Sequence, residues 1–166
     1  MAPLTPSQIS ALDEVIADCQ ELAMRYQNAS CAMDSRACKT PMSALAERFD
    51  LLAGDFAAER HMAGPGGLHE NPLPTCQHLF GWHVASQADE PGRSMAGPIQ
   101  RGEKRLADAL DTLLASGPLP PTLNVLAEQA KAKVGEGPQR HQAGRCLDED
   151  HTTTSSTPEP ALSEVS

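Results

Sequence analysis

Hydrophobic residues recur at helical spacing in four segments of this chain. Apolar side chains three or four positions apart lie on one face of an α-helix. The most regular stripe comprises Ile9, Leu12, Ile16, Cys19, Ala23 and Tyr26. It predicts a first helix from Pro6 to residues 29–33, and Thr5 and Gln8 have the spacing of a capping box at its start.

A second stripe follows after a short turn at residues 34–39. It comprises Met42, Leu45, Phe49, Leu52 and Phe56. It predicts a helix that begins with Thr40 as its cap and Pro41 in its first turn, and that ends near Met62. Because the turn is short, the first two helices are expected to be antiparallel neighbours.

Two further stripes lie in the second half of the chain. They comprise Ile99, Leu106, Leu110 and Leu113, and then Leu123, Leu126, Ala130 and Val134. The first predicts a helix from Pro98 to Ser116, and the second predicts a helix that starts at residues 119–122 and is regular to Lys133 or Val134. The Gly and Pro residues of 135–138 leave two alternatives open: the fourth helix ends there, or it kinks and resumes through residues 139–145.

A long connection separates the two helical pairs. Residues 63–75 are rich in Gly and Pro and predict a loop, and residues 76–87, which include Trp82, predict a short helix lying across the bundle. Two hairpins joined by one long connection have the wiring of ferritin-like bundles. We therefore predict an all-α fold, an antiparallel four-helix bundle of ferritin-like type with a short crossover helix between helices two and three.

The composition agrees with a helical core and sets the domain limits. Hydrophobic residues make up 40% of the 166 residues but aromatic residues only 3%, so the core must be aliphatic, which suits a bundle better than a β-sandwich. We predict an N-terminal lead at residues 1–5, the bundle at 6–145, and a disordered acidic tail rich in Ser, Thr and Pro at 146–166.

Charge and cysteine content narrow the function classes. The net charge is −9 and no basic stripe occurs, so we expect no nucleic-acid partner. No apolar run reaches the roughly 18 residues of a membrane span, so we expect no membrane contact. The five cysteines form no CxxC pair, and no secretory signal precedes the first helix, so reduced thiols and a cytoplasmic location are predicted.

Three of the stripes include an ionisable residue. Glu103 falls on the third stripe, Glu59 follows the second, and His141 follows the fourth if that helix resumes. A carboxylate on an apolar helix face must be paired, protonated or bound to a metal. The alternative is that Glu103 pairs with Arg or Lys at the edge of its stripe, that Glu59 is solvated near a helix end, and that His141 lies in a frayed segment.

Other candidate chemistry is weaker. Cys76, His78 and His83 lack a zinc-ligand spacing and do not share a helix face, so packing of this segment is favoured over metal binding. No nucleophile–base pattern or phosphate-binding loop occurs in the sequence, and we predict no catalytic residue.

Several short motifs together carry a family resemblance over roughly residues 8 to 145. They are Asp18-Cys19-Gln20, Ala57-Ala58-Glu59, Leu79-Phe80-Gly81-Trp82, Arg101-Gly102-Glu103 and Leu119-Pro120-Pro121. Because these motifs occur in this order, the chain resembles a bacterial family of ferritin-like four-helix bundles of unknown function, which is distantly similar to rubrerythrin and ferritin.

The resemblance implies an ancestral di-iron or di-metal site, from which this sequence departs. Gln20 stands where a ligand Glu is expected, with Glu21 beside it, and His61 follows Glu59 by two positions instead of three. Glu21, Glu59, Glu103 and His141 are the residues that would make a surviving site.

Two hypotheses follow. The first is a non-catalytic ferritin-like bundle with a binding, structural or stress-related role, whose partner is a second copy in a homodimer. The second is a protein that binds iron or another divalent metal through the degenerate carboxylate and histidine site.

Overall fold

The computed structural model describes residues 4–63, 95–134, 136, 140 and 142–147, and these are entirely helical or connecting chain. Four main helices are α1 (Pro6–Ala32), α2 (Arg36–Ala63), α4 (Ala96–Ala115) and α5 (Pro121–Lys133). The predicted all-α class and the packed bundle of four helices are confirmed. The predicted crossover helix at 76–87, His141 and residues 148–166 lie outside the described residues.

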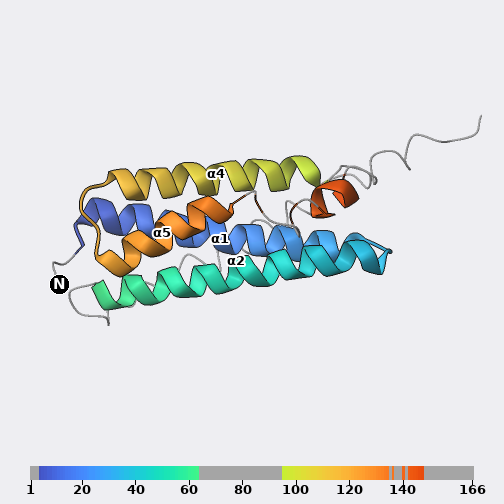
Figure 1. Ribbon diagram of the computed structural model, residues 1–166, viewed down its shortest axis with the longest axis horizontal. Helices are drawn as coiled ribbons and strands as arrows, with labels where there is room; N and C mark the ends of the chain where they lie inside the picture. The colour runs from blue at the N-terminus through green and yellow to red at the C-terminus, as the bar shows by residue number, and fades with distance from the viewer. Residues whose placement is uncertain (1–3, 64–94, 135, 137–139, 141, 148–166) are drawn as a thin grey trace, which may run out of the picture.

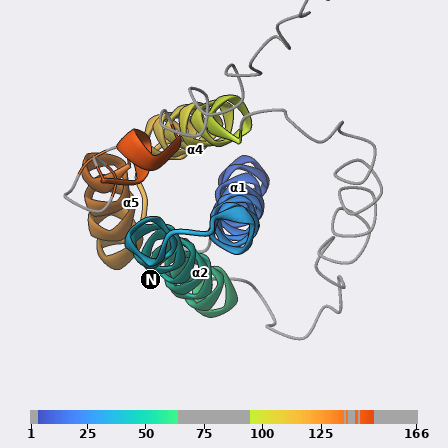
Figure 2. The ribbon, with the colours of Figure 1, turned by 90° about the vertical axis from the view of Figure 1, so that its right-hand side faces the viewer.

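The helices form a four-sided bundle in which each packs mainly against two others. The element α1 contacts α2 and α4, and α5 contacts the same two helices from the opposite side (Figure 2). Arg60 near the end of α2 meets Asp13 near the start of α1, so this pair is antiparallel. Tyr26 on α1 meets Glu103 on α4, while Gln8 meets the Pro118 carbonyl beyond the end of α4, so that pair is antiparallel too.

It follows that α2 and α4 point in the same direction, as the colours in Figure 1 show. The end of α2 and the start of α4 therefore lie at opposite ends of the bundle. The helices α4 and α5 run in opposite directions (Figure 1), so the second hairpin is antiparallel as well, and Lys131 on α5 pairs with Asp111 on α4.

The core is aliphatic, as the composition predicts. Leu12 and Leu22 from α1, Ile99 and Leu106 from α4, and Leu123 from α5 have no exposed surface. One aromatic pair joins them: the rings of Tyr26 and Phe49 stack with centroids 5.7 Å apart. Leu4, predicted to lie in a loose lead, is buried against this core.

The predicted start of α1 is confirmed. Thr5 caps the helix, its side chain accepts from the Gln8 amide, and the Gln8 side chain accepts from the Thr5 amide. This reciprocal pairing satisfies amides that have no partner inside the helix.

The predicted start of α2 is wrong, because the helix begins at Arg36 and Pro41 lies inside it. Thr40 does not cap the helix; its hydroxyl donates to the Arg36 carbonyl. Since Pro41 has no amide proton, the Ala37 carbonyl lacks its usual helical donor. The Gln142 side chain donates to that carbonyl instead, at 3.4 Å.

The breaker cluster ends α5, and the chain then resumes a helical course at residues 140 and 142–147. The second of the two open alternatives is therefore the one observed. Ala143, Cys146 and Leu147 are buried against the core. The packed domain thus extends to residue 147, beyond the predicted limit at 145.

No helix within the described ranges is both long and apolar enough to cross a membrane.

A glycine permits close packing between α1 and α4. A Cβ placed on Gly102 would lie 2.8 Å from Cδ2 of Leu22, which is fully buried. At Gly54, on the exposed side of α2, a Cβ would meet nothing within 4 Å. The absence of a side chain at 102 therefore permits the packing that positions the neighbouring Glu103.

Substituting the two glycines by alanine tests this packing. Gly54→Ala is expected to raise the free energy of unfolding by about 1 kcal/mol through helix propensity. Gly102→Ala gains the same propensity but overpacks the helix interface, so it should be less stable than Gly54→Ala by about 1–3 kcal/mol. Urea denaturation at a protein concentration low enough to keep both variants monomeric measures both, and equal stability of the two variants would contradict the close approach.

Candidate buried carboxylate site

Glu103 is the only charged residue among the described ones that is buried, with 7% of its surface exposed. It lies on the second turn of α4, between the fully buried Ile99 and Leu106, so the apolar stripe turns it toward α1. Of the two positions that the sequence left open, inward on the stripe or at its edge, the inward one is observed.

Two side chains from other elements meet one oxygen of this carboxylate. The Tyr26 hydroxyl on α1 donates to Glu103 Oε1 at 2.6 Å. Arg140 Nε, from the C-terminal segment, lies 2.7 Å from the same oxygen. Of the alternatives for a carboxylate on an apolar face, pairing with an arginine is the one observed. The ion pair is mostly buried, since 17% of the Arg140 side chain and 9% of the Glu103 side chain are exposed.

The surroundings keep Tyr26 protonated. Burial raises the pKa of Tyr26 well above its usual value, and the charge of Glu103 and its hydrogen bond raise that pKa further. The positive charges of Arg140 and Arg48 lower the pKa of Tyr26, but their effect is smaller. The phenol therefore remains a hydrogen-bond donor to Glu103, while stacking on Phe49 fixes its ring.

Glu21 belongs to a separate cluster at the edge between α1 and α4. Arg25 and Arg105 both donate to its carboxylate, and Arg105 Nη2 also lies 3.4 Å from Asp18. Burial opposes ionisation of Glu21, but the hydrogen bonds and charges of the two arginines outweigh it and lower its pKa. Burial raises the pKa of Asp18.

Glu59 lies farther along the bundle axis than the Tyr26 and Glu103 pair. It accepts a hydrogen bond from Thr122 at the start of α5, at 2.8 Å. It follows Phe49, which stacks on Tyr26, by ten residues on α2, or about 15 Å along the helix axis.

The structure therefore does not bring Glu21, Glu59 and Glu103 together. Within the described ranges no group of three or more His, Cys, Asp or Glu side chains could hold a metal ion. His141, the fourth candidate ligand, lies outside those ranges, so a metal role for it stays a prediction.

Neither Tyr26 nor Arg140 was predicted from the sequence as a partner of Glu103. Tyr26 is the only tyrosine of the chain and ends the first apolar stripe, so its hydroxyl needed a buried partner. Arg140 offered no such signal, because it follows the breaker cluster and its position depends on how the chain resumes.

The prediction of reduced thiols is wrong for two of the five cysteines. Cys38 at the start of α2 is disulfide-bonded to Cys146, with 5.6 Å between the Cα atoms. The pair is 108 residues apart in sequence, so spacing alone could not indicate it. Cys19 is a free buried thiol whose pKa burial raises to about 12, and Cys31 is free and exposed.

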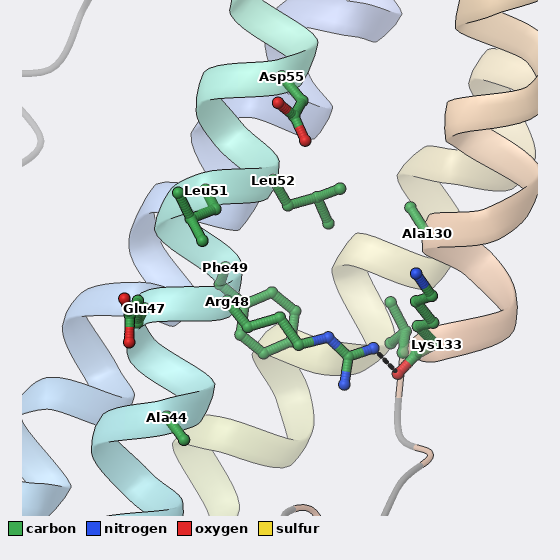
Figure 3. Close-up of a pocket in the computed structure, with 10 residues that line it drawn as sticks. Ala44, Glu47, Arg48, Phe49, Leu51, Leu52, Asp55, Ala130 and Lys133 are labelled. Atoms are coloured by element: carbon green, nitrogen blue, oxygen red, sulfur yellow. Dashed lines mark hydrogen bonds between the residues drawn. The ribbon is translucent and has the colours of Figure 1, made fainter.

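A groove of about 300 Å³ lies between α2 and α5. Figure 3 shows Leu52 extending from α2 toward α5, with Arg48 beside it. Arg48 donates to the Lys133 carbonyl at 2.7 Å and so bridges the two helices. The groove is lined by the apolar side chains of Phe49, Leu51, Leu52, Ala130 and Val134, with charged residues at its rim.

Comparisons with models of protein families, with curated proteins and with solved structures find no match to this chain.

Substituting Tyr26 by Phe tests the buried hydrogen bond. The variant leaves the Glu103 carboxylate without its hydroxyl donor, so the free energy of unfolding should fall by about 1–3 kcal/mol at neutral pH. Because folding raises the pKa of Tyr26, its stabilising contribution is complete below the usual value of 10.0 and is lost as the pH rises above that value.

Chemical denaturation of wild type and Tyr26→Phe across alkaline pH measures this dependence. The stability difference between the two proteins should shrink above pH 10.0, and tyrosinate absorbance of the folded protein should lag behind that of the unfolded chain. A difference that stays constant across this range would contradict the assignment.

Proposed function

We propose that this chain is a ferritin-like four-helix bundle with a binding or structural role, and that its partner is a second copy of itself. The helix directions support the ferritin-like part of the proposal. The helices α1 and α5 run one way and α2 and α4 the other, as in bundles whose two hairpins are joined by one long crossover.

The observation that carries the proposed partner is a stripe on α2 that faces away from the core. Leu51 and Met62 are 63% and 64% exposed, and the small exposed residues Gly54 and Ala58 lie between them on the same face. Contiguous apolar patches on a protein surface, unlike single exposed apolar side chains, often mark interaction sites.

This stripe, Leu51–Gly54–Ala58–Met62, is complementary to itself. An antiparallel second copy centred near residue 56 sets Leu51 against the partner's Met62 and Gly54 against the partner's Ala58. On one flank of the stripe, the exposed Asp50 then meets the partner's His61. The same patch thus supplies apolar contact and close approach on both copies, as a twofold interface requires.

Charge substitutions on the stripe test the homodimer. Leu51→Glu and Met62→Glu each replace a contact expected to contribute about 1.5–3 kcal/mol, so each should raise the dimer dissociation constant about 10- to 100-fold. Sedimentation equilibrium over a concentration series measures this effect.

Val125→Glu is the matched control, because Val125 is a similarly exposed apolar residue on α5 (53%) and lies outside the stripe. Its dissociation constant should equal that of wild type. A monomeric wild type at all concentrations would refute the proposed partner, and an equal effect of Val125→Glu would refute the proposed surface.

Metal binding at Glu103 is the second candidate function, since a buried carboxylate facing the bundle interior favours it. A cation there must compete with Arg140, which is permanently charged and lies 2.7 Å from Oε1. Elemental analysis of untagged protein tests the idea: stoichiometric iron, manganese, zinc or copper that is lost in Glu103→Ala would support it, and metal-free wild type would argue against it.

The predicted cytoplasmic location also stays a proposal. In the cytosol, disulfides are rare and are usually transient and redox-active. In a cytoplasmic protein, the Cys38–Cys146 bond would therefore be expected to undergo reduction.

A further inference from the structure

The C-terminal segment, residues 140 and 142–147, completes the fourth side of the bundle. The helix α5 has 13 residues, whereas α1 has 27 and α2 has 28, so α5 spans only part of the length of its neighbours. Beyond its end the C-terminal segment continues along the bundle (Figure 1). It lies near the start of α2, to which Cys146 and Gln142 connect it.

Among the described residues, apolar burial and two polar contacts hold this segment. Ala143, Cys146 and Leu147 are its buried apolar residues, and Gln142 donates to the Ala37 carbonyl. Arg140 forms the ion pair with Glu103. A helix shorter than about 12 residues is marginal in water without tertiary support. The one covalent support is the disulfide from Cys146 to Cys38.

We propose that the Cys38–Cys146 disulfide is a reducible clasp, a modification site for a dithiol reductant, whose cleavage releases the C-terminal segment and withdraws Arg140 from Glu103. The proposal does not depend on the homodimer, because neither cysteine lies on the exposed stripe of α2. It concerns the opposite half of α2, near its first residue.

The exchange proceeds in two steps that balance. Cys38 is more exposed than Cys146, so its Sγ is the sulfur that a thiolate of the reductant attacks. The attack forms a mixed disulfide with Cys38, and Cys146 leaves as a thiolate and takes up a proton. The second thiol of the reductant loses its proton and displaces Cys38 as a thiolate, which is then protonated. The reductant is oxidised to a disulfide, and two electrons and two protons have moved to the protein.

Reduction has a consequence for the buried carboxylate. Once the segment departs, Glu103 keeps Tyr26 as a donor but loses its guanidinium partner. A buried charge without its counter-charge is strongly unfavourable, so water must enter around Glu103. The clasp thus couples the redox state at one end of the bundle to hydration of a polar cluster between α1 and α4.

Hydrogen exchange followed by mass spectrometry tests the clasp on the full chain, with dithiothreitol as the reductant. Peptide mapping without reductant should first yield Cys38 linked to Cys146. Reduction should then speed amide exchange in residues 142–147 by at least about tenfold, while the core of α1 and α2 stays protected. Cys146→Ser should behave like the reduced protein without any reductant.

Two controls separate the clasp from other effects. Cys31→Ser removes an exposed thiol and should leave exchange in residues 142–147 unchanged. Arg140→Gln in the oxidised protein should leave the segment protected, because the disulfide still holds it. A segment that stays protected after reduction, or a map without the Cys38–Cys146 peptide, would overturn the proposal.

Discussion

The buried carboxylate of Glu103 is the interaction on which the arrangement of this protein depends. A charged group at this depth is tolerated only if both a hydrogen-bond donor and a counter-charge reach it. Tyr26 supplies the donor from α1, and Arg140 supplies the charge from the C-terminal segment. The two partners come from opposite ends of the sequence, so their meeting requires that α1, α4 and the last described residues all be correctly placed.

Several other features of the fold help to place Glu103 and its partners. Gly102 lets α4 approach Leu22 closely, and Glu103 follows it directly in the sequence. Pro41 leaves the Ala37 carbonyl free for Gln142, and the nearby Cys38 binds Cys146, so two contacts secure the segment that carries Arg140. The polar cluster and the packing around it are therefore mutually dependent, which favours one arrangement of the bundle over alternatives.

The periodicity of apolar residues was sufficient to predict four packed helices and to place Glu103 on an apolar stripe, and the spacing of Thr5 and Gln8 predicted the capping box, because these features depend on local sequence. The start of α2 was predicted from a local pattern too. It placed the start of α2 four to five residues too late, since a proline inside a helix resembles a proline at its first turn. It also missed Arg140 and the Cys38–Cys146 bond. Both connect residues far apart in the chain, and no local pattern encodes which distant side chains a fold brings together. Glu59 was grouped with Glu103 because it follows the second apolar stripe, and Glu21 because of the family resemblance, whereas each has its own partners elsewhere.

The bond between Cys38 and Cys146 also gives the molecule an unusual connectivity. Together with the backbone it closes a covalent ring that includes most of α2 and the whole of α4 and α5, leaving α1 as a branch outside it. A single peptide-bond cut anywhere in this ring opens it without dividing the molecule. In its oxidised form the protein can therefore be cut once between residues 38 and 146 and remain one covalent molecule, in which the disulfide joins the two resulting chains.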